Sequence, residues 1–132
     1  MSEKLKLMVV DDEPNNLDLL YRTFRREFKV IKAESASLAM EILDNEGEMA
    51  IIISDQSMPD MTGIQFLKKT RETFPDTVRI LLSGYAEYQI NCDIDEIKEA
   101  DIFKCVTKPC ALPELKDVIR ECVELYKAKK SF

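Results

Sequence analysis

Ala50-Ile51-Ile52-Ile53-Ser54-Asp55 is an almost purely aliphatic stretch that ends in a carboxylate. A short apolar run of this kind predicts a β-strand that is covered on both faces, as the strands of parallel sheets are. The segment from Gln56 to Gly63 contains Pro59 and reads as a turn, and a helical pattern follows it. The stretch therefore predicts a buried strand, a loop and a helix, with Asp55 at the carboxyl end of the strand.

Three other apolar runs also end in polar groups. Leu7–Val10 runs into Asp11-Asp12, Ile80–Leu82 into Ser83-Gly84, and Ile102–Val106 into Thr107-Lys108-Pro109. Strands are predicted over residues 4–10, 28–33, 49–54, 77–82 and 101–107. Regular alternation of strands and helices with short connections predicts a parallel sheet with right-handed crossovers. We expect an α/β fold: a (βα)5, doubly wound, five-stranded parallel sheet in a flavodoxin-like three-layer sandwich.

The segments between these strands carry apolar residues at helical spacing. Each predicted helix has its own apolar stripe. The stripes are Leu17, Leu20, Tyr21, Phe24 and Phe28; Leu38, Ile42 and Leu43; Ile64, Leu67 and Phe74; Ile90, Ile94 and Ile97; and Leu112, Leu115, Ile119, Cys122 and Tyr126. Pro14 is expected in the first turn of the first helix, and Ser35 or Ser37 is the expected N-cap of the second. Residues 1–132 are predicted to form one domain, with 127–132 as a tail or the start of a linker helix.

Composition and charge exclude several classes of function. The net charge of −6 argues against direct binding of nucleic acid. No apolar stretch approaches the roughly 20 residues of a membrane span, and the N-terminus lacks the layout of a signal peptide, so a cytoplasmic location away from membranes is expected. The four cysteines have no CxxC spacing and the chain has no histidine. A zinc site is therefore not expected, and Ser-His-Asp and Cys-His catalysis are excluded.

The polar ends of the four strands define a candidate site. The carboxyl ends of parallel strands lie side by side, and ligands bind there. The side chains expected at this edge are Asp11, Asp12, Asp55, Ser83 and Lys108. Three carboxylates favour Mg²⁺, which prefers oxygen ligands, and an ammonium and a hydroxyl suit a phosphoryl group. A carboxylate can also act as a nucleophile that accepts a phosphoryl group.

These motifs resemble the receiver domain of two-component response regulators along essentially the whole chain. The matching stretches are 8–14, 53–63, 80–84 and 106–109. The resemblance implies that Asp55 accepts a phosphoryl group from a sensor histidine kinase or a phosphotransfer protein. It implies that Asp12 binds Mg²⁺ directly, that Asp11 binds it through water, and that the Ser57 backbone carbonyl is a further ligand.

The resemblance also implies that the Ser83 hydroxyl moves toward the phosphoryl group and that Lys108 forms a salt bridge with it. Receivers of this type catalyse only their own phosphotransfer and dephosphorylation and switch the binding of a partner. One departure concerns Cys105, which stands where the family usually has an aromatic switch residue. We therefore expect a downstream partner or effector domain to bind the face that follows Ser83 and surrounds Cys105, flanked by Asp93, Asp95, Glu96 and Glu99.

Three other functions are compatible with parts of the pattern. A Mg²⁺-dependent phosphatase with an aspartyl-phosphate intermediate typically has a second acid two residues after the nucleophile, where this chain has Ser57. An FMN carrier needs a Ser/Thr/Gly-rich phosphate loop after the first strand, and Asp11-Asp12 would repel that phosphate. The third alternative is a receiver-like scaffold that is never phosphorylated.

Overall fold

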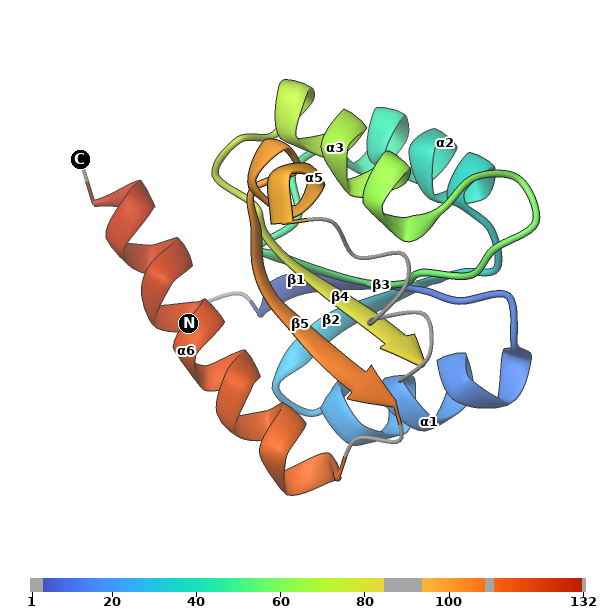
Figure 1. Cartoon of the computed structure of the whole chain (residues 1–132). Helices are drawn as coiled ribbons and strands as arrows, with labels where there is room; N and C mark the ends of the chain where they lie inside the picture. The colour runs from blue at the N-terminus through green and yellow to red at the C-terminus, as the bar shows by residue number, and fades with distance from the viewer. Residues whose placement is uncertain (1–3, 85–93, 109–110, 132) are drawn as a thin grey trace.

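The computed structural model describes residues 4–84, 94–108 and 111–131, in which strands and helices alternate (Figure 1). In chain order the elements are β1 (Leu5–Val10), α1 (Pro14–Phe24), β2 (Phe28–Ala33), α2 (Ala36–Glu46), β3 (Ile51–Asp55), α3 (Gly63–Thr73), β4 (Val78–Gly84), α5 (Ile94–Glu99), β5 (Ile102–Lys108) and α6 (Leu112–Lys130). All described strand pairs are parallel, and the strand order is β2-β1-β3-β4-β5. The predicted doubly wound parallel sheet is confirmed, and each predicted strand lies within two residues of its observed bounds at either end.

The helices cover both faces of the sheet, with α1 and α6 on one side and α2, α3 and α5 on the other (Figure 1). Alternate side chains of β3 separate the two cores: Ile51 and Ile53 pack toward α1 and α6, and Ile52 packs toward α2 and α3. All three isoleucines are at most 1% exposed. This burial on both faces explains why the strand contains no alternation of polar and apolar residues.

Local signals start the helices where the sequence predicts. Pro14 is the first residue of α1, and the Ser35 hydroxyl caps α2 by accepting a hydrogen bond from the Leu38 N–H at 3.1 Å. Thr62 and Gln65 form a capping box at the start of α3, in which each side chain accepts a hydrogen bond from the other residue's backbone N–H. Of the two serines considered for the cap of α2, Ser35 is therefore the residue used.

Two details of the predicted stripes are wrong. Leu38 is 41% exposed, and α2 instead buries Ala36, Ala39 and Leu43 against the sheet. Small residues let α2 lie close to the strands, and this turns Leu38 outward. Phe28 belongs to β2 and not to α1, although it is buried in the predicted core and meets Phe24 edge to face, with ring centroids 6.1 Å apart.

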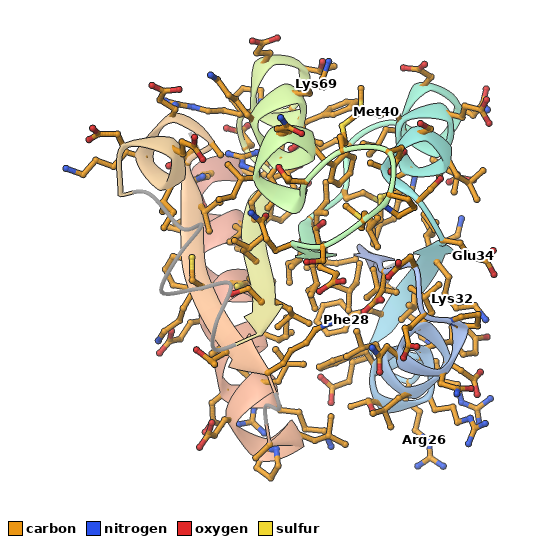
Figure 2. All side chains as sticks on the ribbon, turned by 45° about the vertical axis from the view of Figure 1, so that its right-hand side comes forward. Arg26, Phe28, Lys32, Glu34, Met40 and Lys69 are labelled. Carbon is orange, nitrogen blue, oxygen red and sulfur yellow. The ribbon has the colours of Figure 1, made fainter. Side chains whose placement is uncertain are left out.

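Figure 2 shows Phe28 toward the middle of the molecule, while Arg26 extends outward from the turn between α1 and β2. The turn therefore reverses the chain within four residues, from α1, which ends at Phe24, to the start of β2 at Phe28. The predicted fourth helix falls partly outside the described residues, which include its end as α5. Among the described residues, no helix has both the length and the apolar composition of a membrane span.

The last helix, α6, continues to Lys130, so residues 127–130 are helical. Its first half packs on the sheet through Leu115, Ile119 and Cys122. Its distal end is held by polar contacts: Lys130 Nζ lies 2.8 Å from Glu48 and 3.2 Å from Asp76, and the Tyr126 hydroxyl donates to Glu48 at 2.8 Å. The helix is therefore attached to the sheet in two different ways along its length.

Arg79 is a fully buried cation within β4. Its guanidinium donates hydrogen bonds to the Ala100 carbonyl at 2.9 Å, to the Phe74 carbonyl at 3.0 Å and to the Asp101 carboxylate at 3.1 Å. These partners lie after α5 and after α3. Arg79 thus joins the ends of two helices to the strand whose other end carries Ser83.

Candidate functional site

The sheet register brings the predicted site residues to one edge. Asp55 closes β3 and pairs with Leu82 of β4, and Ser83 of β4 pairs with Thr107 of β5. Lys108 is the last residue of β5, and Asp11 and Asp12 directly follow β1. All these side chains therefore project from the carboxyl ends of adjacent strands, as the sequence predicts.

Three carboxylates meet at the centre of this edge. One oxygen from each of Asp11, Asp12 and Asp55 lies within 4.8 Å of the others. Asp11 and Asp55 are 2% and 6% exposed, whereas Asp12 lies at the surface. Like charges this close repel one another in a partly buried site unless a cation shares them. The cluster is therefore suited to a hard divalent cation, which binds carboxylate oxygens and keeps some of its water.

Lys108 provides the cationic side chain of the site. Its Nζ lies 2.6 Å from Asp55 Oδ1 and 3.5 Å from Asp11 Oδ2. Burial alone would lower the pKa of Lys108, but the hydrogen bond to Asp55 and the charges of Asp11 and Asp55 outweigh burial and raise that pKa. The ammonium thus keeps its charge through the physiological pH range and bridges two of the three carboxylates.

Backbone and amide donors fix Asp11. Its Oδ1 accepts a hydrogen bond from the Glu13 N–H at 2.9 Å, and its Oδ2 accepts one from Asn16 Nδ2 at 3.3 Å. Its own N–H donates to the Ala33 carbonyl at the end of β2, at 3.1 Å. Asn16 was not among the predicted site residues. Its place in the first turn of α1, five residues after Asp11, is the sequence signal that could have revealed it.

Ser83 has a buried hydroxyl next to this cluster in the sheet. The residue is fully buried, and its Oγ is the one buried side-chain polar atom without a hydrogen-bond partner among the described residues. An unpaired buried hydroxyl is costly, so the Ser83 hydroxyl is a candidate to pair with a ligand oxygen at this edge of the sheet. The hydroxyl can donate to an oxygen of a bound anion.

The loop after Asp55, residues 56–62, is closed at its base by Gln56. The Gln56 N–H donates to the Leu82 carbonyl at 2.9 Å, its carbonyl accepts from the Gly63 N–H at 3.0 Å, and its side-chain Oε1 accepts from the Ile64 N–H at 3.0 Å. A Cβ on Gly63 would lie 2.3 Å from the Asp55 carbonyl oxygen, so only glycine fits there. Gln56 and Gly63 therefore fix where α3 begins relative to Asp55, roles that the sequence analysis did not assign.

Two further predicted residues lie at different depths. Ser57 is exposed, two residues after Asp55, and lines a groove of about 990 Å³ together with Asp12 and the acidic side of α5 (Asp95, Glu96 and Glu99). Cys105 is half-buried opposite Leu81 and packs on the core under α2 and α3. Asp93 and the segment directly after Gly84 lie outside the described residues. Among the described residues, the acidic side chains of α5 thus face the loop of residues 56–62.

The sequence of residues 7–120 matches the family model of the response regulator receiver domain. The chain belongs to the receiver family. This membership confirms the resemblance inferred from the motifs: the chain is a receiver domain of two-component signalling.

Among curated proteins, the chain is 38% identical over 130 residues to the hydrogenase transcriptional regulatory protein HoxA of Bradyrhizobium diazoefficiens, covering 98% of this receiver and 26% of that protein. It is 39% identical to HoxA of Cupriavidus necator, covering 94% and 25%. It is 26% identical to the sporulation initiation phosphotransferase F of Bacillus subtilis, covering 91% and 94%. The receiver thus spans about a quarter of the HoxA proteins and nearly all of the Bacillus protein.

Solved structures show the same fold. An adenylate cyclase structure from Rhodopirellula baltica superposes with a TM-score of 0.89 at 25% identity, covering 98% of this chain and 94% of that one. The response regulator TrrA of Thermotoga maritima, solved in complex with Mg²⁺ and BeF, superposes with a TM-score of 0.76 at 26% identity, covering 91% and 99%.

Proposed function

We propose that this receiver accepts a phosphoryl group on Asp55 in a Mg²⁺-dependent reaction and that the modification switches the binding of a partner. The observation that carries the proposal is the environment of Asp55. Its carboxylate is nearly buried at a strand end, contacts the Lys108 ammonium at 2.6 Å, and has two further carboxylates within 4.8 Å. This arrangement supports Asp55 as the nucleophile, the carboxylate cluster as the site of a divalent cation, and Lys108 as the cation beside them.

Mg²⁺ fits the donor set, because all the candidate ligands are oxygen atoms and one of the acids is open to water. Asp12 and Asp55 would bind the ion directly, Asp11 would bind it through water, and the Ser57 backbone carbonyl would complete the protein ligands. When bound, the ion supplies positive charge that offsets the acid cluster and the incoming phosphoryl oxygens.

The protein's own groups then carry the transfer. A carboxylate oxygen of Asp55 attacks the phosphorus atom, a new O–P bond forms, and the bond from phosphorus to the donor's leaving group breaks with its electron pair going to that group. Lys108 already touches Asp55 and can move its ammonium to a phosphoryl oxygen without leaving the site. The Ser83 hydroxyl, buried and unpaired, donates to another phosphoryl oxygen.

The proposed donors are a sensor histidine kinase or a phosphotransfer protein, and the proposed output is contact with a downstream protein or effector domain through the face that follows Ser83 and surrounds Cys105. The receiver would catalyse only its own phosphorylation and dephosphorylation, in the cytoplasm. We also propose that residues 1–132 form a single domain, with residues 127–132 as a tail or the start of a linker helix. The helical course of α6 through Lys130 supports the last point.

A phosphatase that turns over external substrates is the second candidate. It would need an acid in place of Ser57, whose side chain is exposed at the rim of the groove. A scaffold that is never phosphorylated is the third. Both are distinguished from the proposal by the same labelling experiment.

The experiment is incubation of the chain with acetyl phosphate and Mg²⁺, followed by intact-mass spectrometry. We expect one added phosphoryl group in the parent, none in Asp55→Asn, and none in the parent when EDTA is present. Asp44→Asn, which removes an exposed acid from α2, is the control and should label like the parent. Undiminished labelling of Asp55→Asn would refute the assignment, and steady hydrolysis of simple phosphomonoesters would favour the phosphatase.

A further inference from the structure

The loop of residues 56–62 carries the proposed Ser57 ligand and is held at two places. Its base is closed by the hydrogen bonds of Gln56 to Leu82, Gly63 and Ile64 described above. Its tip, Asp60, reaches across to a different element. The position of Ser57, between base and tip, therefore depends on both attachments.

The tip attachment is a charge-assisted pair of hydrogen bonds. Asp60 Oδ2 accepts from the Ser37 backbone N–H at 2.8 Å and from the Ser37 hydroxyl at 2.7 Å, and Oδ1 accepts from the Met61 N–H at 3.1 Å. Ser37 lies in the first turn of α2, whose unpaired N–H groups and helix dipole favour a carboxylate. The hydrogen bonds from Ser37 lower the pKa of Asp60, so the carboxylate stays charged at neutral pH.

The same stretch of chain also holds the other acidic loop. The turn from β2 into α2, residues 33–37, accepts the Asp11 N–H at the Ala33 carbonyl and donates to Asp60 from Ser37. Asp11 precedes Asp12, and Asp60 lies three residues after Ser57. Both loops that carry the proposed Mg²⁺ ligands are thus fastened to one five-residue turn.

We infer that Asp60 is a positioning residue for the Mg²⁺ site: through Ser37 it sets where the Ser57 loop lies relative to Asp11 and Asp12. The inference rests on the proposed function, because it concerns the same metal site. Asp60 would not touch the ion. Loss of a group that hydrogen-bonds a metal ligand typically weakens metal binding by about 10- to 100-fold, and Asp60, which holds the loop and not a ligand, is expected at the lower end of that range.

The alternative is a purely structural role, in which Asp60 only stabilises α2. The chain offers a matched control for that role, because Ser35 caps the same helix through its hydroxyl at 3.1 Å from the Leu38 nitrogen and makes no described contact with the loop. A second control addresses charge. Glu34, an exposed acid in the same turn, lies at the edge of the molecule in Figure 2, and Glu34→Gln removes one negative charge there without removing a described hydrogen bond.

The test measures Mg²⁺ binding to the unphosphorylated chain by titration of backbone amide NMR shifts, together with the Mg²⁺ dependence of acetyl phosphate labelling. For Asp60→Ala we expect the half-saturating Mg²⁺ concentration to rise about tenfold in both assays, with the labelling rate at saturating Mg²⁺ near the parent value. Asp60→Asn keeps an acceptor oxygen and should fall between Asp60→Ala and Glu34→Gln, which should stay within about twofold of the parent. Ser35→Ala should lower the melting temperature but leave Mg²⁺ binding unchanged.

A melting temperature lowered in Asp60→Ala as in Ser35→Ala, with parental Mg²⁺ binding in both, would overturn the inference. If Asp60→Ala does not fold, Ser37→Ala decides: it removes one of the two hydrogen bonds and should raise half-saturation about two- to fivefold, and no rise would refute the role. A failure of the proposed function would give a different experimental result from a failure of this inference. In that case the parent takes no phosphoryl group, or Asp55→Asn takes one, whatever the Asp60 variants do.

Discussion

The substitution Gly63→Ala tests the close approach between α3 and Asp55. By helix propensity alone, alanine should stabilise this helical position by about 1 kcal/mol relative to glycine. The structure predicts the opposite sign. The new Cβ would lie 2.3 Å from the Asp55 carbonyl oxygen, 3.0 Å from its carbonyl carbon and 2.8 Å from a Leu81 methyl group. Two of these atoms are backbone, so no side-chain rotation relieves the overlap.

An ordinary contact starts at 3.4 Å, so the backbone at Asp55 or the start of α3 must move by about 1 Å. Overpacking costs about 1–3 kcal/mol, and an overlap with backbone atoms belongs at the upper end of that range, about 2–3 kcal/mol. After the propensity gain, we expect a net loss of about 1–2 kcal/mol, which corresponds to a melting temperature lower by roughly 4–8 °C for a domain of this size. Because Asp55 itself must move, labelling by acetyl phosphate should also slow, by up to about 100-fold.

Thermal unfolding followed by circular dichroism and intact-mass labelling measure the two effects. Gly47→Ala is the matched control: Gly47 has φ +83°, ψ −156° and open space around its missing Cβ, so alanine there should lose about 1–3 kcal/mol through backbone strain alone and leave labelling unchanged. A Gly63→Ala variant that melts at or above the parent temperature and labels at the parent rate would refute the reasoning.

Three further predictions concern charge and burial. Asp12→Asn should raise the unfolding free energy in EDTA by about 1 kcal/mol, because it removes one exposed acid from the cluster and leaves the Lys108 contacts intact. This gain in stability should vanish in excess Mg²⁺, and a loss of stability in EDTA would contradict the repulsion among the three carboxylates. Arg79→Met should lower the unfolding free energy, measured in urea, by about 2–4 kcal/mol, because buried carbonyls lose their donor. Asp101→Asn, at a half-exposed carboxylate, should cost under about 1 kcal/mol, and equal effects of the two variants would contradict the role of the buried hydrogen bonds of Arg79. Burial raises the pKa of the Cys122 thiol from 9.0 to about 12, so above pH 9 the unfolded chain releases a proton that the folded state keeps. The unfolding free energy should therefore be at its full value below pH 9 and fall as the pH rises toward 12. Rapid Ellman reaction of Cys122 in the folded chain at pH 8 would argue against this.

The fold was predictable because its signals are local and agree with one another. The run that forms β3 is aliphatic up to Ser54 and Asp55, and the start of α2 carries its own cap. The site was predictable for a topological reason: parallel strands deliver their carboxyl ends to one edge, so Asp55 and Lys108 could be brought together without knowing any tertiary contact.

What the sequence did not reveal depends on distant partners. Arg79 sits inside an otherwise aliphatic run, and hydropathy alone cannot show that carbonyls after α3 and α5 accept its hydrogen bonds. Leu38 fits an apolar stripe, but the small residues beside it decided which face of α2 packs. The contact from Asp60 to Ser37 joins residues 23 apart, and each alone reads as an ordinary loop or cap residue.

The two ways in which α6 is attached have a consequence for its behaviour in solution. Packing through Cys122 is apolar, so added salt does not weaken it. The distal end relies on Lys130 with Glu48 and Asp76, which are partly exposed and subject to ionic screening, and on the hydrogen bond of Tyr126. Added salt should therefore weaken the Lys130 ion pairs near the end of α6 without weakening the apolar packing of Leu125, Tyr126 and Cys122 on the core.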